Sequence, residues 1–311
     1  MTAGAGRTPI VVIAGPTASG KSALALAVAE RVGAELCVAD SRQVYRRMDV
    51  GTAKADAATL ARVRHHGVDV AEPREDFDVA RWAALADAAI QEAAGRGVPV
   101  VVEGGTGLYL RALVRGLVAA PARDEGFRAG LRVEAERVGW PALHARLRGV
   151  DPDYAARIQA TDPVRITRAL EVHHATGTPL SLLHEQHGFR EDRYDVLGVF
   201  LDVEPAVLRQ RVGTRARAMW DGGLLHETRA LMRELGDDHK LLTTINYAQA
   251  VAHLRGLLGA REALAEMETK TSQFAKRQRT WFKTETWLQP IQACDHAAFL
   301  ERASRHVTRG R

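Results

Sequence analysis

The sequence has only two cysteines, Cys37 and Cys294, and they lie far apart in the chain. Two such residues make neither a disulfide framework nor a cysteine metal site, so we expect reduced thiols in the cytoplasm. Long hydrophobic runs are also lacking. No apolar run reaches the roughly 18 residues that a membrane span needs, and the first residues, MTAGAGRTP, lack the apolar segment of a signal peptide. These absences favour a soluble intracellular protein.

Aromatic residues are scarce, at 5% of the chain, whereas the apolar fraction of 46% is ordinary for a globular protein. The length of 311 residues exceeds a usual single domain, so we expect one large domain with an insertion, or two domains. The net charge is +5, and residues 270–311 contain nine Lys or Arg against three Asp or Glu. Such a basic segment suits a polyanion, nucleic acid first and an acidic membrane second, although a solvated basic face needs no partner.

A glycine-rich segment, GPTASGKS at residues 15–22, lies between an apolar run at residues 10–14 and a helical pattern that follows it. It matches the phosphate-binding P-loop pattern G-x-x-x-x-G-K-[ST] at every required position. Backbone N–H groups of such a loop surround phosphate oxygens, while Lys21 adds a cation and the Ser22 hydroxyl is a ligand for Mg2+. The predicted site holds a diphosphate or a nucleotide such as ATP, and it comprises Gly15, Pro16, Thr17, Ala18, Ser19, Gly20, Lys21 and Ser22.

Two further segments follow predicted strands, and open parallel sheets bind ligands beyond the carboxyl ends of their strands. Asp40 comes directly after the apolar residues 35–39, so it is either a candidate for chemistry beside the P-loop or a cap of the following helix. The second segment, GGTGLY, starts at residue 104 after the apolar run 98–102. Its glycines would let a substrate approach the backbone closely.

Residues 121–196 are polar, charge-rich and helical in pattern, with no convincing strand. A buried-strand pattern, LGVFLDV, returns at residues 197–203. We therefore predict an α/β fold: a P-loop NTPase-like parallel sheet flanked by helices, with an inserted all-helical subdomain. Its parts are a first core segment at 8–120, the insertion at 121–196, and a second core segment at 197–311 with basic C-terminal helices.

Basic residues recur at three other places that suit a phosphate. Arg165 and Arg168 share one face of a predicted helix, where they either grip phosphates or form surface salt bridges. Four arginines, at positions 209, 211, 215 and 217, precede Met219, and one of them is a candidate to stabilise charge on a leaving group. Residues 274–283, FAKRQRTWFK, interleave cations with aromatic residues, as nucleic-acid surfaces often do.

Taken together, five segments resemble the tRNA dimethylallyltransferase family, also called tRNA isopentenyltransferases. In family order across nearly the whole chain they are GPTASGKS (15–22), DSRQVYRRMDVGTAK (40–54), GGTGLYLRAL (104–113), RALEV (168–172) and AKRQRTWF (275–282). A P-loop alone is shared by very many NTPases. The whole set of segments is specific to this family.

The resemblance implies transfer of a dimethylallyl group from dimethylallyl diphosphate to the exocyclic amine of the adenosine 3′ to the anticodon in tRNA, with release of diphosphate. It implies that the P-loop holds the diphosphate and that Ser22 helps to hold Mg2+, the expected cofactor. The catalytic residues that it implies are Asp40 as general base, Arg215 as the cation on the departing diphosphate, and Ser22.

The same resemblance implies contacts with the tRNA anticodon stem-loop and a flipped adenine that enters a channel opposite the donor. The implied tRNA contacts are Asp40, Ser41, Arg42, Gln43, Thr106, Arg128, Val164, Arg165, Ile166, Thr167 and Arg168. One stretch departs from the family pattern: Ile245-Asn246-Tyr247-Ala248 lacks the usual glycine before the tyrosine and the usual cation after it. Loss of a phosphate contact there would weaken tRNA binding without removing catalysis.

Three alternative functions fit parts of the sequence. A P-loop small-molecule kinase would use the arginine cluster as a lid and ATP as phosphoryl donor, and a nucleotide-switched RNA-binding module would leave Asp40 and Arg215 without roles. Prenyl transfer to a free adenine nucleotide uses the same donor, but the large insertion and the basic C-terminal helix favour a macromolecular acceptor. We expect a cytoplasmic monomer that binds no membrane, because the sequence has neither a heptad pattern nor a long apolar stripe.

Overall fold

The computed structural model describes residues 7–189, 192–292 and 295–308. The chain divides into two compact units: one contains the residues up to Val114 and from Asp192 onward, and the other, Arg115–Glu191, is inserted between those halves. The predicted insertion, 121–196, begins and ends a few residues later than this unit. It includes the first residues of a strand, because that strand begins with the polar Asp195, which carries no strand signature in the sequence.

Six parallel strands form one sheet in the order β3-β2-β4-β1-β5-β6. They are β1 (Pro9–Ala14), β2 (Glu35–Ala39), β3 (His65–His66), β4 (Val100–Gly104), β5 (Asp195–Leu201) and β6 (Gln289–Ile291). The central strands β1 and β4 are buried on both faces, and apart from Glu103 their residues are apolar, as a sheet covered on both sides requires. The prediction of a parallel α/β sheet is confirmed.

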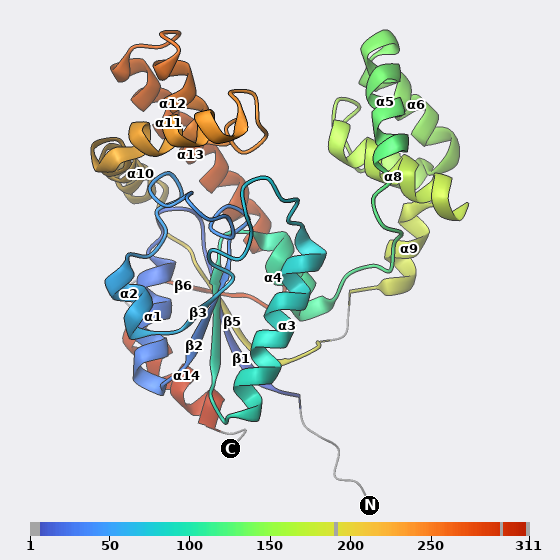
Figure 1. Cartoon of the computed structure of the whole chain (residues 1–311). Helices are drawn as coiled ribbons and strands as arrows, with labels where there is room; N and C mark the ends of the chain where they lie inside the picture. Colours follow the sequence, from blue (N-terminus) through green and yellow to red (C-terminus); the bar gives the residue numbers. More distant parts are fainter. Residues whose placement is uncertain (1–6, 190–191, 293–294, 309–311) are drawn as a thin grey trace, which may run out of the picture. The chain divides into compact units, whose positions relative to one another are not determined.

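Helices cover both faces of the sheet (Figure 1). On one side lie α1 (Lys21–Val32), α2 (Ala57–Arg62) and α14 (His296–Thr308), and on the other α3 (Val79–Gly95) and α4 (Gly107–Arg115). The core on the first side contains Val11 and Ile13 of β1, Val28 of α1 and Phe299 of α14. α14, the last described helix, therefore closes the core around the first strand of the chain.

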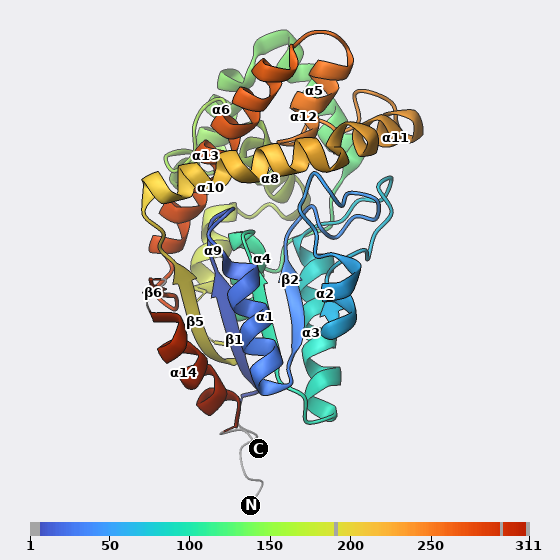
Figure 2. The same ribbon diagram turned by 90° about the vertical axis from the view of Figure 1, so that its left-hand side faces the viewer.

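A second group of helices stands over the carboxyl ends of the strands (Figures 1 and 2). It consists of α10 (Pro205–Met219), a π-helical turn η1 (Trp220–Leu224), α11 (Leu225–Leu235), α12 (Tyr247–Leu254) and α13 (Ala260–Lys283). α13 packs against α10 and α12 and descends to the sheet, where Phe282 lies 6.3 Å from Phe200, centroid to centroid. No helix among the described residues is long and apolar enough to cross a bilayer.

The inserted unit has its own hydrophobic core. Its helices are α5 (Glu125–Val138), α6 (Trp140–Val150), α7 (Pro152–Ala155), α8 (Pro163–Thr176) and α9 (Leu180–His187). Leu131, Leu147, Ile166 and Leu170 pack at its centre. Its described residues contain no strand, so the prediction of an all-helical insertion is confirmed.

Only one of the two cysteines, Cys37, lies among the described residues. Cys37 is a free thiol buried in β2, and burial raises its pKa to about 12. A thiol with so high a pKa stays protonated and unreactive at neutral pH. Cys294 lies outside the described residues.

Candidate active site at the P-loop

The P-loop connects the end of β1 to the start of α1. Gly20 is the N-cap residue of α1, and no side chain caps that end of the helix. The loop is closed by two backbone bonds, from Gly15 N to Gly104 O at 3.3 Å and from Ser19 N to Pro16 O at 3.1 Å. The uncapped end of α1 presents N–H donors and the positive end of the helix dipole, which is the arrangement that binds phosphate.

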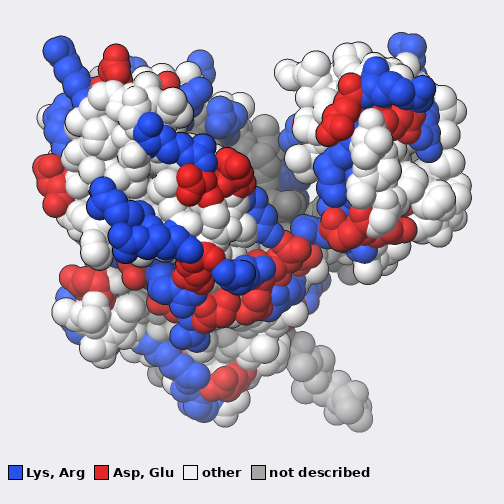
Figure 3. Space-filling model, turned by 45° about the horizontal axis from the view of Figure 1, so that its top comes forward, with Lys and Arg blue, Asp and Glu red and all other residues white. Residues whose placement is uncertain are grey.

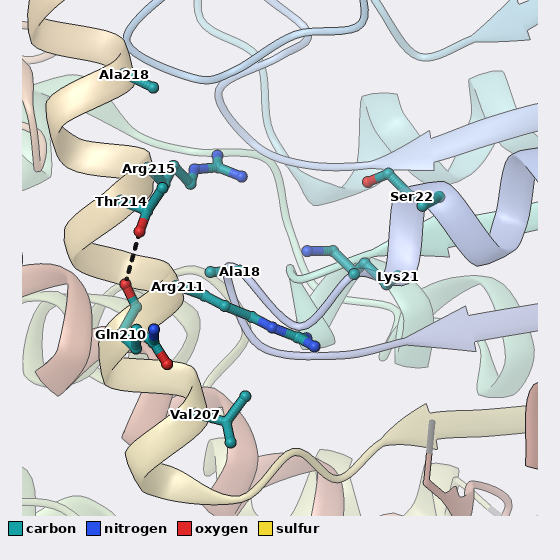
Figure 4. Close-up of a pocket in the computed structure, with 11 residues that line it drawn as sticks. Ala18, Lys21, Ser22, Val207, Gln210, Arg211, Thr214, Arg215 and Ala218 are labelled. Carbon is teal, nitrogen blue, oxygen red and sulfur yellow. Dashed lines mark hydrogen bonds between the residues drawn. The ribbon is translucent and has the colours of Figure 1, made fainter. Parts of the chain in front are cut away.

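A pocket of about 580 Å³ lies between the P-loop and α10 (Figure 4). Arg211 donates from Nη1 to Ser19 O at 3.0 Å, and Arg215 donates from Nη2 to Thr52 O at 3.0 Å. Of the four predicted arginines these two line the pocket, whereas Arg217 pairs with Glu268 on α13. The pocket residues are Ala18, Gly20, Lys21, Ser22, Ala23, Val207, Gln210, Arg211, Thr214, Arg215 and Ala218.

Four charged groups at this site influence one another. Burial lowers the pKa of Lys21, while the charge of Glu103 opposes that shift and Arg215 adds to it. Burial likewise lowers the pKa of Arg215, against the opposing charges of Asp40 and Glu103. The site thus holds two cations and two carboxyl groups in a desolvated space, where charges interact strongly.

Asp40 lies directly after β2, as predicted. Its Oδ1 accepts the backbone N–H groups of Arg42 at 2.8 Å and Gln43 at 3.3 Å. The following residues form turns, so Asp40 caps a turn and not the helix that was the alternative to a chemical role. Its Oδ2 makes no hydrogen bond within the described part of the chain, which leaves one oxygen able to accept a proton.

Glu103 was not singled out from the sequence. It sits in β4 next to the P-loop strand, and its Oε1 accepts a hydrogen bond from Ser22 Oγ at 3.1 Å. Its other oxygen is buried and has no hydrogen-bond partner among the described residues. Burial raises the pKa of Glu103, against the opposing charge of Lys21 and the hydrogen bond from Ser22. The sequence feature that could have identified Glu103 is an acidic residue near the end of an otherwise apolar strand, VVVEG.

The GGTGLY turn and α13 are in close contact. Gln278 accepts the backbone N–H of Thr17 at Oε1, at 2.9 Å, and donates from Nε2 to Gly105 O at 2.8 Å. A Cβ at Gly107 would lie 2.3 Å from the Trp281 ring. Gly105 and Gly107 therefore admit side chains of α13, and Gly104 admits Ala39 of β2. The approach of a substrate to this turn stays a prediction.

One side of the basic, aromatic segment 274–283 consequently packs into the fold, while its other side is exposed. Gln278 and Phe282 are buried, Arg279 and Lys283 pair with Asp202, and Trp281 lies beneath Arg111 at 4.7 Å. Figure 3 shows Lys and Arg interspersed with Asp and Glu over the face drawn there, without a field of one sign. Arg279 and Lys283 thus share one carboxylate, whereas Lys276 and Arg277 are exposed on the surface of α13.

The predicted tRNA-contacting residues divide between the two units. Ser41 donates its backbone N–H to Thr106 Oγ1 at 3.1 Å, which brings the turn after β2 to the turn after β4. Gln43 donates from Nε2 to Thr52 O at 3.3 Å, and Arg42 is exposed. These residues and Asp40 therefore lie together at the strand ends, beside the P-loop.

In the inserted unit, Glu171 organises the predicted contacts. Its carboxylate is 1% exposed and accepts hydrogen bonds from Arg128, at 2.6 and 2.8 Å, and from Arg168, at 2.6 Å. Burial opposes ionisation of Glu171, but the bonds from Arg128 and Arg168 outweigh it and lower its pKa to about 2. Both arginines thus stabilise the fold of the inserted unit through Glu171.

The remaining predicted contacts lie on α8. Val164 is 76% exposed and the Arg165 side chain 63% exposed, and Thr167 is half-buried. Ile166 is fully buried in the core of the unit. Its side chain therefore does not belong to a surface contact, because neighbouring positions on a helix point in different directions.

Comparison with known proteins identifies the family. The sequence matches the family described as IPP transferase over residues 43–285. The chain belongs to the IPP transferase family. It is 51% identical over 284 residues to a tRNA dimethylallyltransferase of Anaeromyxobacter dehalogenans strain 2CP-C, covering 90% of this chain and 95% of the relative. It is 44% identical over 282 residues to the tRNA dimethylallyltransferase of Myxococcus xanthus, covering 91% and 92% of the two chains.

Solved structures of the IPP transferase family agree in fold. The full-length tRNA isopentenylpyrophosphate transferase of Bacillus halodurans superposes with a TM-score of 0.71 at 30% identity, over 98% of each chain. A eukaryotic dimethylallyltransferase acting on tRNA gives a TM-score of 0.79 over 96% of this chain and 77% of its own, and at 24% identity it shows the shared fold alone. The family resemblance stated from the sequence and the P-loop NTPase-like fold are confirmed.

Proposed function

We propose that this IPP transferase moves a dimethylallyl group from dimethylallyl diphosphate to the exocyclic amine of the adenosine 3′ to the anticodon in tRNA. The observation that carries the proposal is the pocket between the P-loop and α10, where Lys21, Arg211 and Arg215 face one space near the carboxyl group of Asp40. It combines a cradle for a diphosphate with a base beside it.

The donor diphosphate binds to the backbone N–H groups of residues 17–22, with Lys21 neutralising part of its charge. Arg215 lies on the opposite wall of the pocket, where its guanidinium stabilises the charge that builds on the departing diphosphate. Mg2+ fits this site, because the Ser22 hydroxyl lies beside a buried carboxyl oxygen without a partner, and Mg2+ prefers oxygen ligands. Bound there, Mg2+ would neutralise charge on the diphosphate oxygens.

The chemical step forms one bond and breaks another. The adenosine amine attacks the first carbon of the prenyl group, the bond from that carbon to the diphosphate oxygen breaks, and Asp40 takes the amine proton. Oδ1 of Asp40 is held by two backbone N–H groups, so the side chain is fixed while Oδ2 remains able to accept the proton. The reaction attacks carbon, so the P-loop holds a leaving group and not a phosphoryl donor.

The tRNA acceptor is proposed to contact Asp40, Ser41, Arg42, Gln43 and Thr106 in the first unit. In the inserted unit, Val164 and Arg165 are the exposed candidates. The target adenine leaves its stack to reach Asp40, which costs only a few kcal/mol for an unpaired loop base. We further propose that the enzyme acts as a monomer in the cytoplasm.

The test is in vitro prenylation with the purified protein, dimethylallyl diphosphate, Mg2+ and an anticodon stem-loop RNA. Mass spectrometry of the digested RNA should show one dimethylallyl group on the adenosine 3′ to the anticodon, with one diphosphate released per group. An RNA with guanosine at that position is the matched control and should stay unmodified.

The alternatives give different products. A kinase would release ADP from ATP and no diphosphate from dimethylallyl diphosphate. Transfer to free adenosine monophosphate in place of the RNA would show a nucleotide prenyltransferase. Absence of any prenylated product, with the protein folded and RNA bound, would refute the proposed function.

A further inference from the structure

Glu103 lies at the P-loop mouth, and it takes part in neither the bond that the proposed reaction forms nor the bond that it breaks. In the sheet register it stands between Ile13 of β1 and Val38 of β2. The residue is 6% exposed, and Oε2 is buried without a hydrogen-bond partner among the described residues. Leaving a carboxyl oxygen in this state costs free energy, so a native structure that keeps one calls for an explanation.

The bond between Ser22 and Glu103 sets the direction of the serine hydroxyl. Ser22 Oγ donates its hydrogen to Glu103 Oε1 at 3.1 Å, so both oxygen lone pairs of Ser22 are available for a cation. Ser22 is exposed toward the pocket between the P-loop and α10, and it also lines a second cavity, of about 220 Å³, with Glu103. One serine thus connects the phosphate pocket with the buried carboxyl group.

The charges at the site favour a cation. Before the donor binds, Lys21 and Arg215 stand against Asp40 and Glu103. A diphosphate adds further negative charge beside an unpaired carboxyl oxygen, and like charges in a desolvated site repel strongly. A divalent cation between the diphosphate and Glu103 turns this repulsion into attraction.

We propose that Glu103, together with Ser22, holds the Mg2+ that accompanies the diphosphate, with Oε2 facing the metal either directly or through a metal-bound water. An acidic residue on a strand next to the P-loop strand has this task in P-loop NTPases, so the geometry is chemically sound for a donor diphosphate as well. This inference rests on the proposed function, because it takes the diphosphate of the donor to be the ligand of the P-loop.

The opposing interpretation is that Glu103 only fixes Ser22 and the end of β4. The substitution Glu103→Gln separates the two roles, because glutamine has the same size and keeps an acceptor oxygen for Ser22 but carries no charge. Glu35→Gln is the matched control. Glu35 is also a buried glutamate, 7% exposed, but it begins β2 at the opposite end of the sheet, where His66 and Arg96 bind it.

The experiment measures the rise in melting temperature that inorganic diphosphate causes at increasing Mg2+ concentration. For Glu103→Gln we expect the half-maximal Mg2+ concentration to rise about 10-fold or more, as loss of groups that orient a bound metal commonly causes. In the absence of Mg2+, diphosphate should stabilise the variant as much as the native protein or more, because a repelling charge is gone. Glu35→Gln should keep the native Mg2+ dependence.

Equal Mg2+ dependence of Glu103→Gln and the native protein would overturn the inference, and so would a parallel loss of stabilisation with and without Mg2+. Neither result would touch the donor site, since the native protein would still bind diphosphate. If Mg2+ adds nothing to the stabilisation of the native protein by diphosphate, the inference fails and the donor site stands. If diphosphate does not stabilise the native protein with or without Mg2+, the proposed donor site fails with it.

A measurement on the native protein needs no variant. Fe2+ in place of Mg2+, with ascorbate and peroxide, cuts the backbone near a bound metal, and the fragments are identified by mass spectrometry. With diphosphate present we expect cuts near residues 19–22 and near residues 102–105. Cuts at the P-loop without any near residue 103 would contradict the proposed position of the metal.

Discussion

Glu227 of α11 fastens the loop that follows the turn after β2 to the helical layer. Its Oε2 accepts the backbone N–H groups of Asp49 and Val50, each at 2.8 Å. Its Oε1 accepts the Gly51 N–H at 2.9 Å and the Tyr247 hydroxyl at 2.6 Å. A Cβ at Gly51 would lie 2.4 Å from Tyr247 Cζ, so the loop fits against α12 without spare room. One carboxylate thus serves four donors.

The substitution Glu227→Gln keeps the size of the side chain and leaves a single acceptor oxygen. If that oxygen accepts the N–H groups of residues 49 and 50, the amide nitrogen of the new glutamine points at the other two donors. The Gly51 N–H then has no acceptor, and the Tyr247 hydroxyl has to rotate so that it accepts a hydrogen bond from the amide. A hydrogen bond to a charged group contributes about 1.5–3 kcal/mol and a neutral one about 1 kcal/mol, while a donor left without an acceptor costs about 1–3 kcal/mol. Two weakened bonds and one lost acceptor therefore destabilise the protein by about 2–7 kcal/mol.

The same loop carries an acceptor for the pocket arginine. Thr52 O receives Arg215 Nη2 at 3.0 Å, so a displaced loop releases the guanidinium that we place on the diphosphate. We therefore expect kcat of Glu227→Gln to fall about 10-fold, roughly the effect of 1.4 kcal/mol on a barrier, with a smaller change in KM for the donor. Urea unfolding and steady-state prenylation kinetics measure the two effects.

The control is Glu234→Gln on the same helix. Glu234 pairs with Arg47, whose side chain is 50% exposed, at 3.0 Å, and an exposed pair of this kind contributes less than about 1 kcal/mol. If Glu227→Gln lost no more stability than Glu234→Gln and kept its kcat, the reasoning about the loop would be refuted.

Four further outcomes follow from the site and the inserted unit. Asp40→Asn keeps an acceptor for the turn, so it should lose about 100-fold or more in turnover while binding donor and tRNA, and near-native turnover would exclude it as the base. Arg215→Ala should lose turnover similarly, whereas an effect on tRNA affinity alone would reassign it to the RNA surface. Glu171 has a pKa of about 2 in the folded protein against an ordinary 4.5, which corresponds to about 3 kcal/mol of folding stability. This stability is present above pH 4.5 and is lost as the pH falls toward 2. The free energy of unfolding of Glu171→Gln, measured over the same pH range, should lack that loss. Asn246→Gly should unfold at a higher urea concentration than Asn246→Ala, because Asn246 has a φ of 77°.

Asn246 also shows how a departure from the family pattern is accommodated. Its backbone has a φ of 77°, a conformation that glycine adopts readily, and the family usually has glycine there. Asparagine tolerates positive φ better than most residues, and its Nδ2 donates to Gly51 O at 2.8 Å. The substitution therefore adds a bond to the loop that Glu227 also holds. That the missing glycine and cation at residues 246 and 248 weaken tRNA binding remains a prediction.

The sheet and the P-loop were predictable because their signals are local. Apolar runs of strand length and the spacing of Gly15, Gly20, Lys21 and Ser22 are properties of neighbouring residues, and neighbours are what a sequence displays. Glu103 escaped prediction for the opposite reason. Glu103 matters because it accepts a hydrogen bond from Ser22, which lies 81 positions away in the sequence, and because the fold leaves its other carboxyl oxygen without a partner among the described residues. Partners of that kind are set by tertiary packing.

The segment 275–282 shows the same limit. Its alternation of cations and aromatic residues predicted an RNA surface, which stays a prediction for the exposed Lys276 and Arg277. Other members of the segment pack inside the molecule: Gln278 joins Thr17 to Gly105, and Trp281 fills the space beside Gly107. Composition identified the residue types correctly. It could not tell a surface that meets a ligand from one that meets the rest of the chain, because both favour the same amphipathic side chains.

The family segments in the first unit are specific as a set because they form one connected structure. Gln278 bonds the P-loop to the GGTGLY turn, Ser41 bonds that turn to the turn after β2, and Arg215 bonds the next loop to α10. A change in any one segment alters the geometry of its neighbours, so each restricts the others. Kinases also use a carboxylate base and arginines beside a phosphate, so these charged groups suit attack on carbon and attack on phosphorus alike. Asp40, Glu103 and Arg215 all influence the charge of Lys21, and the connected segments that hold them there are the ones that mark the family.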